Sequence, residues 1–180
     1  PKYPAVRFPT FVEESASALA WIHTHIAEYN GNPARIHIIG HSAGAHIGAM
    51  LAADSHYLKA HSKTPTQVIH DFVGLAGPYA FTPDEPDLMA IFPKPYEAMR
   101  VTSFIAGHEP PMLLLWGDAD TDVGRFNLER LQTAIEDAHG KVRSIIYPAQ
   151  DHIDLIKNLT WLGNDNGTML RDVLGFFSNT

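Results

Sequence analysis

Residues 35–44, Arg-Ile-His-Ile-Ile-Gly-His-Ser-Ala-Gly, decide the fold of this chain. The apolar run Arg35–Ile39 predicts a buried β-strand, and the small-residue stretch Ala43–Ala53 after it predicts a helix. The Gly-x-Ser-x-Gly pattern between them predicts a sharp turn, in which glycine on both sides lets strand and helix approach without Cβ clashes. Ser42 is thereby predicted to be an exposed nucleophile at the strand-to-helix junction. The alternative is a glycine-rich turn with an incidental serine.

The rest of the chain alternates short apolar runs with helical patterns. Three further runs predict strands: Val68–Leu75, Met112–Trp116 and Val142–Tyr147. The other predicted helices are one that starts with a Thr10–Glu13 capping box and stops at Asn30-Gly31, one over Leu128–Ala138 and one over Met169–Phe177. Such alternation predicts an α/β fold, a mainly parallel sheet flanked by helices, in a single domain over residues 1–180.

A proline-rich segment, Pro78–Pro111, interrupts this alternation. It holds seven prolines and five aromatic residues. A long irregular segment in a compact domain is usually a lid or a binding loop, so we expect it to form a lid or part of a substrate pocket. The alternative is a surface connection packed by its own aromatic side chains.

A serine nucleophile needs a base, and the base needs an orienting carboxylate. In parallel-sheet hydrolases these follow in the chain order Ser, Asp or Glu, His, on loops after strands. The loop after the third predicted strand offers Asp118, Asp120 and Asp122. Beyond it only His139 and His152 remain, and His139 falls at a predicted helix end, where histidine commonly complements the helix dipole. His152 is therefore the predicted base, with a surface loop histidine as the alternative.

The serine turn also predicts part of an oxyanion hole. The helix after Ser42 points its first amides at the serine, and the Ala43 N–H is a natural donor to an oxyanion formed there.

Several motifs together resemble one family. They are Gly-His-Ser-Ala-Gly-Ala-His at 40–46, Phe-Val-Gly-Leu-Ala-Gly-Pro-Tyr at 72–79, Leu-Leu-Leu-Trp-Gly at 113–117 and a late loop histidine. Over nearly the whole chain the sequence is similar to the α/β-hydrolase superfamily, and within it to carboxylesterases of the hormone-sensitive lipase and kynurenine formamidase type. The family pattern Gly-x-x-Asp-x-x-Val, laid on Gly117–Val123, selects Asp120. The resemblance thus implies a triad of Ser42, Asp120 and His152.

The chain departs from the family in two places. The family's upstream His-Gly-Gly motif, whose amides complete the oxyanion hole, has no counterpart before Phe11, and Ala80 stands where the family often has Asp. We therefore expect an N-terminally truncated hydrolase or a fragment of a longer chain. The predicted strand Arg35–Ile39 would then be an edge, open to self-association or to the missing N-terminal segment.

These features predict a serine hydrolase that cleaves small-molecule carboxylic esters through an acyl-enzyme. Two alternatives stay open: an amidase or formamidase acting on a small aromatic substrate, and a non-catalytic, truncated hydrolase scaffold.

Composition excludes other classes of protein. A net charge of −7 argues against a nucleic-acid partner, and no apolar run reaches the length of a membrane span. The absence of cysteine excludes disulfides and thiol catalysis. The start Pro1-Lys2-Tyr3 shows no leader, which favours the cytoplasm.

Two patterns suggest a metal site, and both are rejected. Residues 118, 120, 122 and 129 match acidic positions of a calcium loop, but Val123 occupies the position that needs glycine. His37, His41 and His46 lack the His-Glu-x-x-His spacing and are expected to pack against the sheet. We therefore expect no metal and no cofactor.

Overall fold

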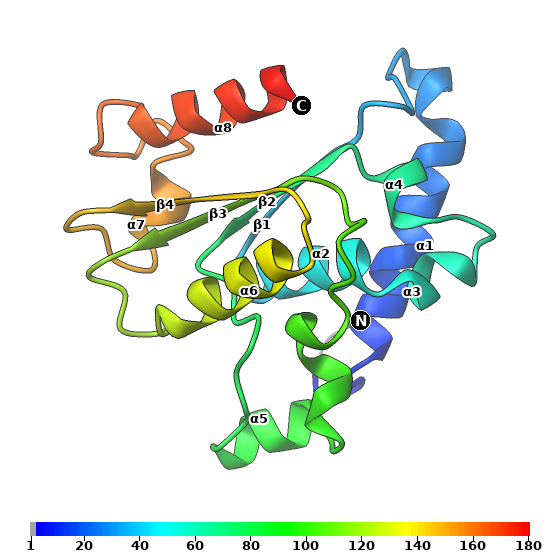
Figure 1. Ribbon diagram of the computed structural model, residues 1–180, viewed down its shortest axis with the longest axis horizontal. Coiled ribbons are helices and arrows are strands. Elements are labelled where there is room, and N and C mark those ends of the chain that lie inside the picture. The colour runs from blue at the N-terminus through cyan, green and yellow to red at the C-terminus, as the bar shows by residue number, and fades with distance from the viewer. Residues whose placement is uncertain (1–2) are drawn as a thin grey trace.

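The computed structural model describes residues 3–180, so residues 1 and 2 of the expected domain lie outside the described residues. Within them, one parallel sheet holds β1 (His37–His41), β2 (Asp71–Leu75), β3 (Met112–Gly117) and β4 (Val142–Tyr147), side by side in chain order (Figure 1). Helices lie on both faces of this sheet. The expected α/β fold with a mainly parallel sheet is confirmed.

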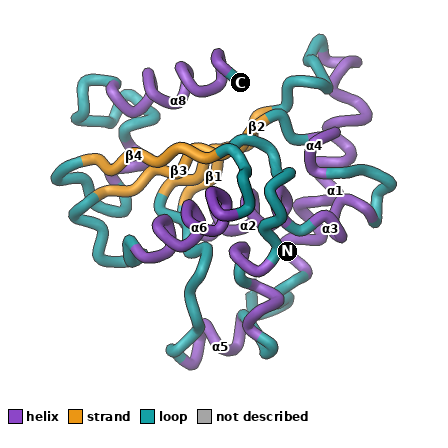
Figure 2. Tube along the Cα trace, in the orientation of Figure 1, coloured by secondary structure: helices purple, strands orange, loops and turns teal. Residues whose placement is uncertain are grey.

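The longer helices form the two outer layers. Helices α1 (Thr10–His25), α2 (Ala43–Ala53) and α6 (Phe126–Asp137) lie on one side of the sheet and α8 (Thr168–Asn179) on the other (Figures 1 and 2). Small residues let α2 lie close to the strands: a Cβ on Gly48 would come within 2.6 Å of the Phe72 ring. The close packing of α2 fixes the direction in which its N-terminus points.

Short helices fill the connections. They are α3 (Ser55–Lys59), α4 (Pro65–Val68), α5 (Pro86–Ile91) and α7 (Asp154–Lys157), with 3₁₀ turns at Ile26–Tyr29, Tyr96–Met99 and Val101–Ser103. The segment Pro78–Pro111 therefore contains one helix and two 3₁₀ turns. Figure 2 shows its α5 part extending away from the sheet, on the side of α2 and α6.

Three predicted strands had wrong bounds, and the third differs least, because it ends at Gly117, one residue after the predicted Trp116. The first begins two residues later than predicted, at His37, where pairing with Asp71 starts. The second is shorter than Val68–Leu75, because Pro65–Val68 forms helix α4 instead. Proline suits the first turn of a helix, where no amide hydrogen is needed.

The predicted capping box at Thr10 and Glu13 is wrong. Thr10 lies inside α1, Pro9 occupies the cap position, and no side-chain hydrogen bond caps the helix. The amides of Val12 and Glu13 donate to the Pro9 carbonyl oxygen at 2.8 and 3.1 Å. Because these first amides close on the Pro9 carbonyl oxygen, α1 begins at Thr10, one residue before the predicted boundary.

The core lies around the two central strands. Every residue of β2 and β3 is buried, as expected for strands covered on both faces. Among the described residues β1 pairs with β2 alone, so β1 is an edge strand, and Ile39 on it is 45% exposed. The C-terminal ends of these strands carry the residues that the sequence singled out.

Candidate active site

Ser42 occupies a one-residue turn between β1 and α2. Its backbone has φ 54° and ψ −120°, a conformation that costs a non-glycine residue about 1–3 kcal/mol. Two bonds hold it there: the Ser42 amide donates to the Leu75 carbonyl oxygen at 2.9 Å, and its own carbonyl oxygen accepts from His46 N at 3.1 Å. Backbone strain of this kind is typical of functional positions.

The two glycines around Ser42 have different roles. A Cβ on Gly40 would lie 2.4 Å from the carbonyl oxygen of Gly44, so this position has no room for a side chain. A Cβ on Gly44 would meet no described atom within 4 Å. The prediction that both glycines are needed to avoid clashes is therefore wrong for Gly44, because its Cβ would point into open space.

His152 and Asp120 form a buried pair at the ends of β3 and β4. The Nδ1 of His152 lies 2.9 Å from Oδ2 of Asp120, and the carboxylate is fully buried. The other oxygen of Asp120 accepts the amides of Asp122 and Val123, both at 2.9 Å. A carboxylate oxygen can only accept, so a proton on Nδ1 of His152 would donate to Asp120 and leave the Nε2 lone pair free.

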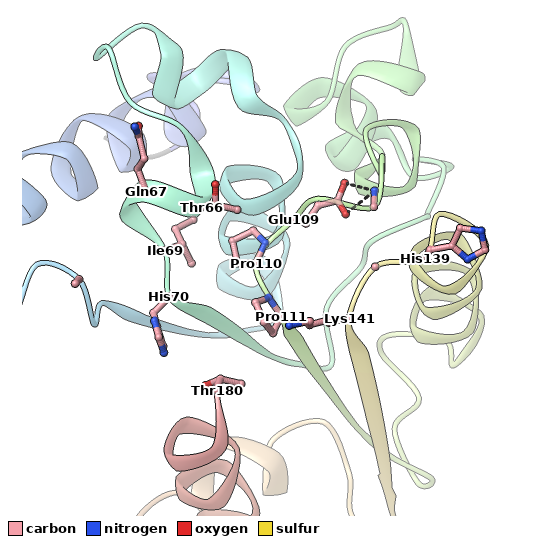
Figure 3. Close-up of a pocket in the computed structure, with 13 residues that line it drawn as sticks. Thr66, Gln67, Ile69, His70, Glu109, Pro110, Pro111, His139, Lys141 and Thr180 are labelled. Atoms are coloured by element: carbon pink, nitrogen blue, oxygen red, sulfur yellow. Dashed lines mark hydrogen bonds between the residues drawn. The ribbon is translucent and has the colours of Figure 1, made fainter.

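The other candidates lie elsewhere. Asp118 is exposed and accepts the amide of Ala149, and Asp122 is exposed at the rim of the cavity described below. His139 lies at the opposite end of the strands, where it lines a second cavity of about 390 Å³ with Lys141 and Thr180 (Figure 3). His139 is thus on a different surface from Ser42.

Ser42, Ala43 and His152 line one cavity of about 800 Å³. Its apolar wall is formed by Phe11, Ile47, Phe81, Leu88, Ile91, Phe92 and Phe126, and its rim carries Asp84, Glu85 and Asp122. The Ala43 N–H belongs to the first turn of α2, where amides have no acceptor within the helix. Among the described residues no hydrogen bond joins the Ser42 hydroxyl to His152.

Two histidines of the Gly-His-Ser-Ala-Gly-Ala-His motif make contacts that sequence reasoning missed. His46 is buried, and its Nε2 lies 2.7 Å from the Met99 carbonyl oxygen. Burial lowers the pKa of His46 to about 4, so the ring is neutral and donates to that carbonyl. His41 lies with its Nε2 2.8 Å from the carbonyl oxygen of His152. The only sequence signal was the presence of two histidines beside the serine.

Neither a metal site nor a membrane span is evident in residues 3–180. No group of three or more histidines and carboxylates there has an arrangement that could hold a metal ion. None of the helices that the structure describes combines the length and apolar character needed to cross a bilayer.

Comparisons with known proteins point to one superfamily. The BD-FAE family model matches residues 3–85, just under half of the chain. Esterase LipQ of Mycobacterium tuberculosis is 27% identical over 154 residues, which cover 76% of this chain and 37% of that protein. The probable isoprenylcysteine alpha-carbonyl methylesterase ICMEL1 of Arabidopsis thaliana is 23% identical over 177 residues, covering 85% and 37%. The chain thus spans little more than a third of the length of these relatives.

Solved structures agree on the fold. Thermogutta terrifontis esterase 2, phosphonylated by sarin, superposes with a TM-score of 0.78 at 17% identity, over 96% of this chain and 65% of that one. With the strand–serine–helix turn at the end of β1, the chain has the fold of these α/β-hydrolase esterases, and its sequence is similar to that of named carboxylesterases.

Proposed function

We propose that this chain carries the catalytic centre of a serine esterase, with Ser42 as nucleophile, His152 as base and Asp120 as the residue that orients His152. The main support is the buried hydrogen bond between Asp120 and His152 at 2.9 Å, on the wall of the cavity that Ser42 also lines. A neutral imidazole with its proton on Nδ1 presents the Nε2 lone pair that a base needs.

In the proposed reaction, Nε2 of His152 takes the proton of the Ser42 hydroxyl as its oxygen attacks the ester carbonyl. The Ala43 N–H donates to the oxyanion of the tetrahedral intermediate. His152 then passes the proton to the leaving alcohol, which gives an acyl-enzyme on Ser42. Water activated by the same imidazole attacks the acyl-enzyme, releases the acid and restores the serine. Asp120 stabilises the imidazolium formed in each step.

The segment Pro78–Pro111 supplies part of the proposed substrate pocket. Phe81, Leu88, Ile91 and Phe92 come from its first half and line the cavity beside Ser42. An apolar wall beside a few polar groups is typical of small-molecule sites. We therefore propose a small-molecule ester whose acyl or alcohol part is apolar.

Labelling with a fluorophosphonate tests the nucleophile. The phosphonylated form of the Thermogutta esterase makes an organophosphorus probe the natural choice. The probe should label the wild-type chain, and Ser42→Ala should take no label and lose the burst of p-nitrophenol from p-nitrophenyl butyrate. Equal ester turnover by both proteins would reject the proposal. A folded chain that takes no label and turns over no ester would instead be a non-catalytic scaffold.

A further inference from the structure

The ring of His41 lies between the serine turn and the loop that carries His152. His41 is the last residue of β1 and directly precedes Ser42. Its Nε2 is 2.8 Å from the carbonyl oxygen of His152, and the two imidazole centroids are 4.6 Å apart with their planes at 47°. One side chain thus contacts both the backbone and the ring of His152.

The chemistry of this contact fixes the state of His41. A carbonyl oxygen only accepts hydrogen bonds, so Nε2 of His41 carries a proton and donates. Burial lowers the pKa of His41, and the nearby His152 ring lowers it further, against the opposing effects of the backbone bond and of Asp120. His41 is therefore neutral at pH 7. A neutral ring can stay beside His152 while the latter gains a proton, without adding a second positive charge.

Three other hydrogen bonds of the His152 loop lead to a different strand. The Gln150 carbonyl oxygen accepts the amide of Ala119 at 3.1 Å, and the Ala149 amide donates to Asp118. Asp120 holds the imidazole of His152 itself. All three partners follow β3. Among the hydrogen bonds within residues 3–180, the one from His41 alone joins residues 148–153 to the β1–α2 turn.

We propose that His41 is a positioning residue, whose hydrogen bond to the main chain of His152 sets how closely the imidazole approaches the Ser42 hydroxyl. The proposal rests on the proposed esterase function. Asp120 fixes which face and tautomer the imidazole presents, whereas His41 links the imidazole to the strand that carries the nucleophile. Misplacing a reacting group by about 1 Å can cost about 10²-fold in rate, so a lost link of this kind is measurable.

The experiment compares His41→Leu, which lacks the donor, with His41→Gln, whose amide N–H has a similar reach to the imidazole Nε2–H. For p-nitrophenyl butyrate, His41→Leu should lower kcat by about 10- to 100-fold with little change in KM, and His41→Gln should recover most of the loss. His108→Leu changes an exposed loop histidine and serves as the matched control. His41→Met is a second donor-free variant, to be used if His41→Leu fails to unfold cooperatively.

A readout without turnover separates positioning from the proposed function. The Nδ1–H proton of His152 gives a downfield ¹H NMR signal, identified by its loss in His152→Ala. It should shift or broaden in the donor-free variant and return in His41→Gln. Wild-type kcat together with an unchanged signal in a folded donor-free variant would overturn the inference, as would equal losses in the Gln and donor-free variants. Ester turnover that survives Ser42→Ala would reject the proposed function, and the NMR comparison would still decide the role of His41.

Discussion

The carbonyl oxygen of Gly44 lies so close to Gly40 that a methyl group on Gly40 would approach it to 2.4 Å. The opposing atom belongs to backbone, which cannot move without displacing the start of α2. Gly40→Ala should therefore destabilise the fold by about 2 kcal/mol or more and abolish fluorophosphonate labelling. Gly44→Ala is the matched control, and it should be neutral or stabilise the helix by up to about 1 kcal/mol. Urea unfolding of both variants measures the difference, and equal losses would contradict this view of the turn.

The strained backbone of Ser42 predicts that the residue lowers the stability of the fold, and that a substitution that relieves the strain raises it. With φ at 54°, alanine at this position keeps the strain and glycine relieves it. Ser42→Gly should therefore be more stable than Ser42→Ala by about 1 kcal/mol, and under the proposed function neither variant would form an acyl-enzyme. Thermal and urea unfolding of the pair test this directly. If Ser42→Gly were the less stable of the two, the strain would not be real.

Asp120→Asn should reverse the tautomer of His152. The amides of Asp122 and Val123 require an oxygen acceptor, so the new side chain must turn its NH₂ group toward His152. Nδ1 of His152 would then accept and Nε2 would carry the proton, which leaves no base for Ser42. We expect kcat to fall by about 10³- to 10⁴-fold. Asp118→Asn keeps the acceptor that Ala149 uses, and its kcat should stay within about threefold of wild type.

The buried His46 should make stability fall in acid. Its pKa is about 4 in the folded chain, because burial disfavours the charged ring, against an ordinary value of 6.5. Between these values the unfolded chain binds the extra proton, so stability is complete above pH 6.5 and declines as the pH drops toward 4. The loss is on the order of 3 kcal/mol. Urea unfolding from pH 7 to 4 should show a shallower decline in His46→Gln, which keeps a donor for the Met99 carbonyl. Parallel curves would rule out His46 as the source.

The edge at β1 predicts association. Its outer side has unpaired backbone groups within the described residues, and Ile39 is 45% exposed. We propose that this edge pairs with a second copy, or with further chain of the kind that the longer relatives contain. The isolated chain should therefore elute in gel filtration with a size that grows with concentration, and Ile39→Lys should reduce this growth. Ile156→Lys, at another exposed position, is the control. A chain that stays monomeric at all concentrations would refute pairing of this edge with a second copy.

Local pattern was enough to predict most elements of the fold. The bounds of α2 and β4 were predicted correctly, because Ser42 and Asp54 flank a stretch rich in alanine and glycine and because β-branched and aromatic residues begin and end the stretch 142–147. Errors arose where two local signals competed. Val68 has a strand-forming side chain but lies close to Pro65, which favours the start of a helix, and the structure places Val68 in helix α4.

Contacts between residues far apart in the chain could not be predicted from the sequence. The partner of His46 is a backbone oxygen 53 residues away, and that of His41 is 111 residues away. A side chain's type says nothing about which carbonyl it will meet. Spacing alone also left three carboxylates after β3 as candidates to orient the base, and a family pattern was needed to select Asp120. The structure gives a physical difference among them, since only Asp120 of the three is buried.

The order of the strands has a consequence for how the sheet is made. Each strand of the described sheet is added beside the one that came before it, from β1 to β4. Pairing therefore needs no later segment to insert between earlier ones, and the loops closed at each step are short relative to the chain. The sheet can therefore form in the order of synthesis. The loop that carries His152 can pack beside Ser42 only after β4 has emerged from the ribosome.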